Sequence, residues 1–439
     1  MDLLKTDVKK LYFKYLASSF GSVMMSTIYS TVDMAMVGQY HGPDGAAALA
    51  VIAPFWNIVC SLGLLTGIGG SILFSTCRGA GSHRDENQYF TVSAIGSVAL
   101  ALPVWLIFIF AEHGVLSFFG ADESLFELAH RYLLPLKFIL PLILFNQMLA
   151  AFLRNDGDPS RAAAGVLVGG IFNVFGDYFF VFIMDMGIFG AGLATAIGTT
   201  MTSAVMLTHF FSAKNTLKLV KTTKFISRLK EVVTAGFSTF FIDLAMGILT
   251  VLFNRQVMKL LGSEALSIYG VIINVSTFVQ CCAYSVGQAA QPIISTGFGA
   301  KRWDRISETL KYALLSCAGF SLVWTGLSMV CPNLYIRIFM SPTESILAAA
   351  PPIIRCYALS FMLLPLNVFS TYYFQAVMRP STAVIVSVAR GCVISGALIL
   401  LLPLVAGADA LWFAMPITEA ITAVYVIAKI REYSNKMKA

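Results

Sequence analysis

Apolar residues occur along this chain in long runs separated by short polar breaks. Each run holds about 20 residues or more, the length of α-helix that crosses the hydrocarbon core of a bilayer. Polar and charged residues gather at the breaks, where a membrane protein meets water. The pattern predicts an all-α membrane protein with twelve transmembrane helices, at residues 12–37, 48–74, 89–111, 132–153, 161–183, 188–211, 234–258, 265–294, 310–332, 352–377, 382–405 and 409–430.

Composition supports a membrane location. Hydrophobic residues make up 57% of the 439 positions and charged residues 12%, whereas an ordinary soluble domain has about 25% charged residues. The formal net charge of +7 does not indicate a nucleic-acid partner, because Lys and Arg lie between the apolar runs and not on a basic face with interleaved aromatics. Membrane lipids are the expected surroundings.

The distribution of basic residues predicts the topology. Of the 30 Lys and Arg residues, 23 lie at the termini or in every second loop, and the opposite loops hold only Arg131, Arg255, Lys259 and Arg337. Cytoplasmic loops carry the excess of positive charge in membrane proteins. We therefore expect a protein of the cell (inner) membrane with both termini in the cytoplasm.

An internal repeat relates the two halves at a shift of about 220 residues. Residues 75–80 (STCRGA) align with 295–300 (STGFGA), and Asp158-Pro159-Ser160 aligns with Arg379-Pro380-Ser381. Six helices separate equivalent points, so the copies have the same orientation, a parallel repeat of the kind that transporters use. We expect two six-helix lobes facing a central cleft. The predicted units are an amino-terminal lobe at 1–213 (the N-lobe), a basic cytoplasmic linker at 214–230 and a carboxy-terminal lobe at 231–439 (the C-lobe).

Seven ionisable residues fall inside the apolar spans. Each costs about 2.5 to 3.5 kcal/mol at a helix centre, so these side chains should face the protein interior or water. Lys137, Arg355, Arg390 and Glu419 are interpreted as structural ion pairs or as side chains that reach the membrane surface. The other three, which are candidates for a functional site, are Asp33, Asp177 and Asp243.

Asp177 and Asp33 are the strongest candidates for an ion site. Asn173 precedes Asp177 by four residues and shares its helix face, and Asp33 ends a polar stripe that includes Tyr29. If the first and fifth helices meet, two carboxylates share a dry pocket, which favours a proton carrier or an oxygen cage for Na⁺. Hydrogen bonding that merely joins the helices is the alternative.

Asp243 lies beside Phe240 and Phe241 on the seventh predicted helix. An acid among aromatic rings suits a cationic amphipathic ligand, through charge attraction and cation–π contact. Pairing of Asp243 with a neighbouring Arg is the alternative interpretation.

Catalytic signatures are missing from the sequence. There is no HExxH, GxSxG or pair of neighbouring histidines, and the cysteines lie inside apolar segments without CxxC spacing. We therefore expect neither an enzyme nor a resident cofactor.

Several segments, taken in order, resemble the multidrug and toxic compound extrusion family over nearly the whole chain. These segments are Ser30 to Gln39 (STVDMAMVGQ), Gly79-Ala80-Gly81 with its repeat Gly299-Ala300-Lys301, Leu153 to Pro159, Asn173 to Tyr178, and Gly190 to Thr195.

The resemblance implies a V-shaped pair of lobes that exports organic cations and drugs in exchange for H⁺ or Na⁺, as a monomer. It implies a cation site at Asp33, Asn173, Asp177 and Thr195. With Asp243 we expect Phe240, Tyr29 and Asn367 to contact the substrate. The chain departs from some members in having Asn367 but no acid on the tenth helix, and no proline within 12–37.

A lipid-linked oligosaccharide flippase of related architecture is the alternative function. A pyrophosphate headgroup would require Arg or Lys in the cavity, and Arg355 and Arg390 are the residues that keep this hypothesis open.

Overall fold

The computed structural model describes residues 2–119, 121–339 and 343–438. The regular structure in these ranges is helical. The N-terminal helices are α1 (Val8–Gly79), α2 (His83–Phe110), α3 (Glu112–Phe118), α4 (Glu123–Lys137), α5 (Leu140–Asn155), α6 (Pro159–Tyr178), η1 (Phe179–Ile183), α7 (Gly187–Leu207) and η2 (Thr208–Phe211). After an irregular segment at 212–224 come α8 (Phe225–Gly299), α9 (Trp303–Val330), α10 (Pro332–Phe339), α11 (Glu344–Ala358), η3 (Leu359–Met362), α12 (Leu364–Ala376), α13 (Pro380–Val388), η4 (Ala389–Val393), α14 (Ile394–Ala406), η5 (Ala408–Phe413) and α15 (Ala414–Lys438).

Two of these helices are each long enough for two membrane spans. α1 breaks at Gly42 (φ 68°) and α8 breaks at Gly262 (φ 84°). Both values lie in the left-handed region, which glycine adopts without the steric cost that a Cβ atom imposes. The breaks therefore divide each helix into two arms, and the arms correspond to the predicted spans before and after residues 42 and 262.

The twelve predicted spans are confirmed within the described residues. Nine helical segments are long and apolar enough to cross a membrane, and α4 with α5 forms a tenth that bends by 60°. Counting both arms of α1 and of α8 gives twelve. The bend in the α4–α5 span precedes Pro141, whose missing N–H suits the first turn of a new helix.

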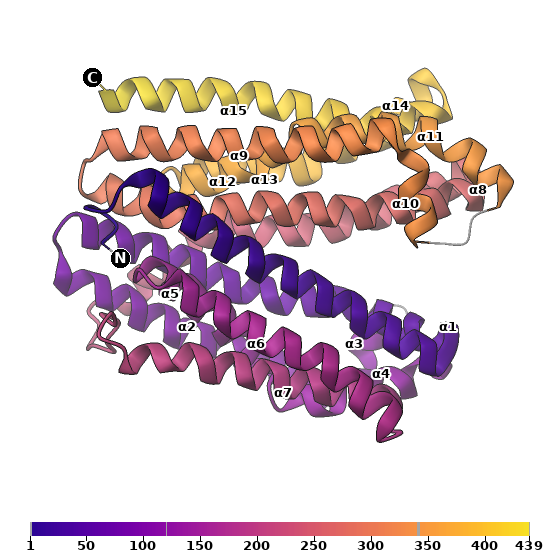
Figure 1. Cartoon of the computed structure of the whole chain (residues 1–439), viewed down its shortest axis with the longest axis horizontal. Helices are drawn as coiled ribbons and strands as arrows, with labels where there is room; N and C mark the ends of the chain where they lie inside the picture. Colours follow the sequence, from indigo (N-terminus) through magenta and orange to yellow (C-terminus); the bar gives the residue numbers. More distant parts are fainter. Residues whose placement is uncertain (1, 120, 340–342, 439) are drawn as a thin grey trace.

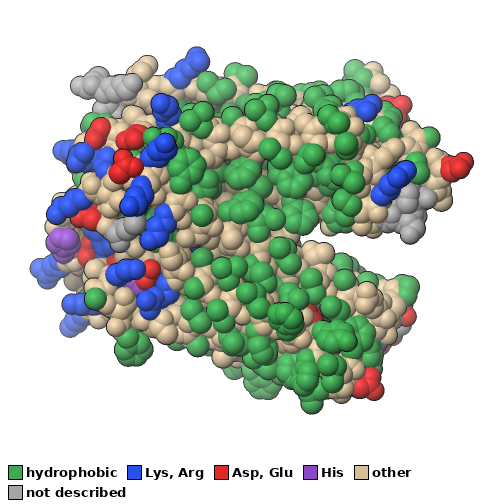
Figure 2. All heavy atoms as spheres, viewed as in Figure 1, with side chains coloured by type: hydrophobic (Ala, Val, Ile, Leu, Met, Phe, Trp, Pro, Cys, Tyr) green, Lys and Arg blue, Asp and Glu red, His purple; other side chains and the backbone are tan. Residues whose placement is uncertain are grey.

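The lobes meet at one end and separate at the other. Both ends of the chain lie at the left in Figure 1, and the Lys and Arg side chains visible in Figure 2 gather mainly at the same end. At the right end, near α3, α4, α10 and α11, the space-filling view shows an open notch between the two halves. The cleft therefore opens away from the basic end of the molecule.

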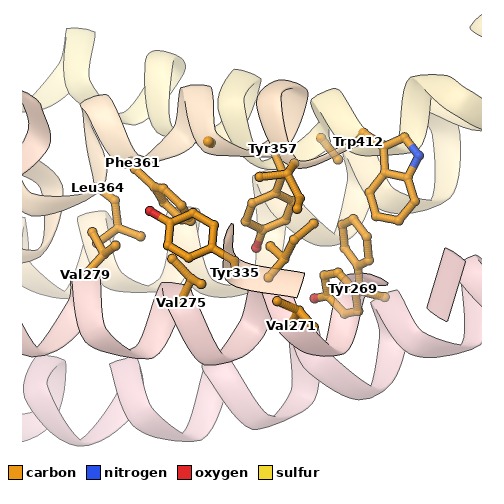
Figure 3. Close-up of a cluster of buried hydrophobic side chains, with 14 of the residues drawn as sticks. Tyr269, Val271, Val275, Val279, Tyr335, Tyr357, Phe361, Leu364 and Trp412 are labelled. Carbon is orange, nitrogen blue, oxygen red and sulfur yellow. The ribbon is translucent and has the colours of Figure 1, made fainter. Parts of the chain in front are cut away.

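An aromatic cluster stabilises the C-lobe near the open end of the cleft. Phe253 on the first arm of α8 stacks on Tyr269 of the second arm, with ring centroids 4.4 Å apart. Figure 3 shows Tyr269, Tyr357 and Trp412 converging from α8, α11 and η5. This contact between Phe253 and Tyr269 joins the two arms of α8 across the Gly262 break.

Candidate cation and substrate site

The N-lobe site is built where α6 packs closely against α7. A Cβ atom on Gly198 of α7 would lie 2.6 Å from the carbonyl oxygen of Gly169 on α6, so only glycine permits this approach. One turn further along α6, Asn173 Nδ2 donates a 2.9 Å hydrogen bond to Thr195 Oγ1 on α7. The small residues thus allow polar side chains of the two helices to meet in the lobe interior.

Asp33 reaches this region from the first arm of α1. Its carboxylate is 6% exposed, and its Oδ2 accepts a 2.5 Å hydrogen bond from the hydroxyl of Tyr132 on α4. Asp177 on α6 is fully buried and lies within electrostatic range of Asp33. The structure therefore brings Asp33, Asn173, Asp177 and Thr195 together from three helices.

Four buried oxygen atoms in this group have no hydrogen-bond donor within the described chain. They are Asp33 Oδ1, Asn173 Oδ1 and both carboxylate oxygens of Asp177. Carboxylate and amide oxygens are acceptors, so a proton or a hard cation can satisfy them. A buried pair of carboxylates without a countercharge is unfavourable, and uptake of a cation removes that cost.

Two neighbouring cavities give access to part of the group. One of about 630 Å³ is lined by Asn173 and Thr195, and another of about 560 Å³ is lined by Asp33, Tyr132 and Thr195. Tyr29 lines both cavities. Asp177 lines neither cavity and lies one turn along α6 from Asn173.

Asp243 lies between the lobes and not within one of them. It is partly exposed on α8, accepts a 2.5 Å hydrogen bond from the hydroxyl of Tyr284 and lies 3.5 Å from Ser61 Oγ on the second arm of α1. In the described part of the chain no Lys or Arg forms an ion pair with Asp243. Phe240, also partly exposed, packs against Phe237, with ring centroids 6.2 Å apart.

Asn367 is placed differently from the other predicted substrate residues. It is fully buried on α12, and its Nδ2 donates to the backbone oxygen and to Oε2 of Glu419 at 2.9 and 2.6 Å. Glu419 forms a 2.8 Å ion pair with Arg390. Asn367 therefore belongs to a buried polar group inside the C-lobe.

The remaining ionisable residues of the spans have structural contacts. Lys137 Nζ lies 2.7 Å from Glu112 Oε2. Arg355 is exposed and donates from Nε to the backbone oxygen of Met329 at 3.0 Å. Ion pairing thus holds Lys137, Arg390 and Glu419 as the sequence indicated, whereas Arg355 bonds to a carbonyl group.

Tyr132 and Tyr284 were not singled out from the sequence. Tyr132 has no polar neighbour at helical spacing, and the one that Tyr284 has four residues earlier, Gln280, is neutral and does not indicate an acidic partner. The available signal was chemical: a tyrosine inside an apolar span needs a partner for its hydroxyl, and a buried carboxylate is a strong acceptor.

Comparison with known proteins gives a consistent picture. The family model MatE matches residues 19–179 and 238–399. The multidrug export protein MepA of Staphylococcus saprophyticus is 24% identical over 375 residues, which is 84% of this chain and 82% of that protein. MepA of Staphylococcus aureus is 22% identical over 423 residues, covering 95% of this chain and 92% of that protein.

Solved structures share the fold. One is an outward-facing multidrug resistance MATE family transporter of the MOP superfamily, with a TM-score of 0.91 at 19% identity, covering 99% of this chain and 98% of that one. A MOP superfamily transporter from Pyrococcus furiosus has the same TM-score and identity, with 100% and 98% covered. Because the MatE model spans well over half of this chain and reaches into both lobes, the chain belongs to the MatE family of multidrug efflux transporters.

Proposed function

We propose that the protein is an antiporter that exports amphipathic organic cations in exchange for H⁺ or Na⁺. The observation that carries the proposal is the set of four donor-free oxygen atoms on Asp33, Asn173 and Asp177. A cation that binds reversibly would remove the free-energy cost of burying these oxygen atoms without donors. Cation binding there favours one arrangement of the lobes, and the exported compound favours the other.

Asp243 is the proposed anchor for the exported compound. Its carboxylate is partly exposed between the lobes, touches Ser61 of one lobe and Tyr284 of the other, and has aromatic neighbours. A cation with an apolar body can satisfy both the charge and the rings. Tyr29, which lines both N-lobe cavities, is proposed to contact the same compound.

The orientation follows from the basic end of the molecule. With that end in the cytoplasm of a cell (inner) membrane, both termini are cytoplasmic and the cleft opens to the outside. We further propose that the monomer is the transporting unit and that it needs no cofactor besides the coupling ion.

The flippase hypothesis is not favoured. Of its two candidate phosphate ligands, Arg390 is paired with Glu419, and Arg355 bonds to the Met329 carbonyl group. The comparisons point to multidrug exporters.

Single substitutions of the two acids test the proposal. Asp33→Asn and Asp177→Asn should abolish drug resistance in a sensitised host while the membrane level of the protein stays unchanged. Asp409→Asn, which changes an exposed acid of the C-lobe, should preserve resistance. Full resistance in both site variants would remove the N-lobe acids from the mechanism.

A further inference from the structure

The two lobes place the same amide contact at equivalent points. In the N-lobe, Asn146 on α5 donates from Nδ2 to the backbone oxygen of Thr199 on α7 at 3.1 Å. In the C-lobe, Asn367 on α12 donates from Nδ2 to the backbone oxygen of Glu419 on α15 at 2.9 Å. The repeat shift of about 220 residues relates Asn146 to Asn367, and it relates Thr199 to Glu419. Glu419 therefore occupies the position in the C-lobe that Thr199 occupies in the N-lobe.

A second pair of equivalent positions lies on α6 of the N-lobe and on the span that begins with α13 in the C-lobe. Gly169 and Arg390 each follow the aligned prolines Pro159 and Pro380 by ten residues. Arg390 thus stands where the N-lobe has a glycine without a side chain.

The equivalent positions have opposite contents. Asn146, Gly169 and Thr199 line the cavity of about 630 Å³ that also contains Asn173 and Thr195. In the C-lobe, Arg390 donates from Nε to Glu419 Oε1 at 2.8 Å, with Nη2 also 2.8 Å from that atom. Asn367 holds the other carboxylate oxygen at 2.6 Å. An ion pair therefore fills the region that is open in the N-lobe.

We propose that Arg390 is a built-in countercation that occupies the C-lobe equivalent of the N-lobe cation cavity, so that coupling ions bind only in the N-lobe. Glu419 is fully buried, and a carboxylate in that position requires a cation. A guanidinium group stays charged at any relevant pH and is covalently attached. The pair therefore keeps the same charge throughout the transport cycle. It neither binds nor releases a coupling ion.

The proposal rests on the ion coupling inferred above, and it predicts what loss of the tethered charge does. Arg390→Ala leaves the Glu419 carboxylate beside Asn367 Oδ1, a buried oxygen that already has no donor in the described chain. A carboxylate and an amide oxygen facing an open space reproduce the chemistry of Asp177 and Asn173. The variant should then bind an additional mobile cation.

The experiment measures ethidium transport in proteoliposomes as a function of H⁺ and, separately, of Na⁺ concentration. For the ion that drives the wild type, Arg390→Ala should steepen the dependence, raising the Hill coefficient by up to one. Arg390→Ala combined with Glu419→Gln should return the steepness to the wild-type value. Arg355→Ala, which removes an exposed arginine of the same lobe, should leave it unchanged.

Each outcome decides a different claim. A coupled wild type with an unchanged slope in Arg390→Ala would overturn the countercation proposal alone. If Arg390→Ala does not fold, the double variant decides: monodisperse protein with wild-type coupling supports the proposal, and loss of the gradient response contradicts it. A wild type that responds to neither ion would overturn the proposed antiport itself, and the countercation role with it.

Discussion

Gly79 at the end of α1 packs directly on the backbone carbonyl oxygen of Thr296 in α8, with no space for a Cβ atom between them. The repeat produces the same contact in reverse, because Gly299 packs on the carbonyl oxygen of Thr76. Nearby, Asn155 and Gln291 exchange two amide hydrogen bonds of 3.0 Å between the lobes. These contacts join the lobes at the basic end and oppose the opening of the cleft on that side.

Substitution of Gly79 should loosen this closed end. In Gly79→Ala the added methyl group would overlap backbone atoms, which cannot rotate away, so the helices must separate. Overpacking of this kind costs about 1 to 3 kcal/mol. We expect a lower melting temperature in detergent and slower ethidium export. Gly319→Ala is the matched control, because nothing lies within 4 Å of its added Cβ. Equal effects of the two substitutions would contradict the proposed role of the contact.

Asp243 should determine the preference for charged compounds. Asp243→Asn keeps the size of the side chain and its contact with the Tyr284 hydroxyl but removes the negative charge. We expect ethidium export to fall at least about tenfold, as the loss of about 1.4 kcal/mol of attraction would produce, while export of an uncharged dye changes little. Ser61→Ala is the control, because it removes the 3.5 Å contact with Asp243 and a hydrogen bond to the Asn57 carbonyl group but leaves the charge of Asp243 in place. A parallel loss for both dyes would contradict a charge-selective role.

Asp156, between α5 and α6, should make stability depend on pH. Burial raises its pKa, but His209, Arg78 and Thr216 outweigh burial and hold the pKa below the usual value. Because the pKa is lower in the folded state, the stabilisation is complete above the unfolded-state value of about 3.9. It is lost as the pH falls through the folded-state pKa.

The measurement for Asp156 is thermal unfolding in detergent, from pH 7 down to below about pH 4. At pH 7, Asp156→Asn should lower stability by about 3 kcal/mol, because it removes a buried carboxylate that forms an ion pair with Arg78 and hydrogen bonds with His209 and Thr216. The deficit should shrink as the pH falls below about 4, where the wild type loses the same contribution. Asp2→Asn, at an exposed ion pair with Lys5, should change stability little at either pH. A deficit that is independent of pH would contradict this account.

The sequence predicted the spans well because hydrophobic length alone determines them. It did not predict that the segments around Gly42 and Gly262 are breaks inside continuous helices, since a polar gap between apolar runs is compatible with either a loop or a break. The short helices α3 and α10 were also missed, because a helix of seven or eight residues leaves no long periodic pattern.

The candidate site was predictable only in part. The spacing of Asn173 and Asp177 placed them on one helix face, but the approach of Asp33 depends on how α1 packs in the lobe, and helix periodicity does not report that packing. Asn367 shows the same limit, because its burial against Glu419 follows from the contact between α12 and α15. Tyr132 was missed because its role depends on a contact with a helix about 100 residues earlier.

The central claim is that the N-lobe acids couple ion entry to export. The most direct test loads proteoliposomes with ethidium and imposes a pH gradient or a Na⁺ gradient, one at a time, on wild type, Asp33→Asn and Asp177→Asn. We predict that one of the two gradients drives transport by the wild type and that neither gradient drives it in the variants, although both variants reconstitute normally. Gradient-driven transport that persists in both variants would contradict the account.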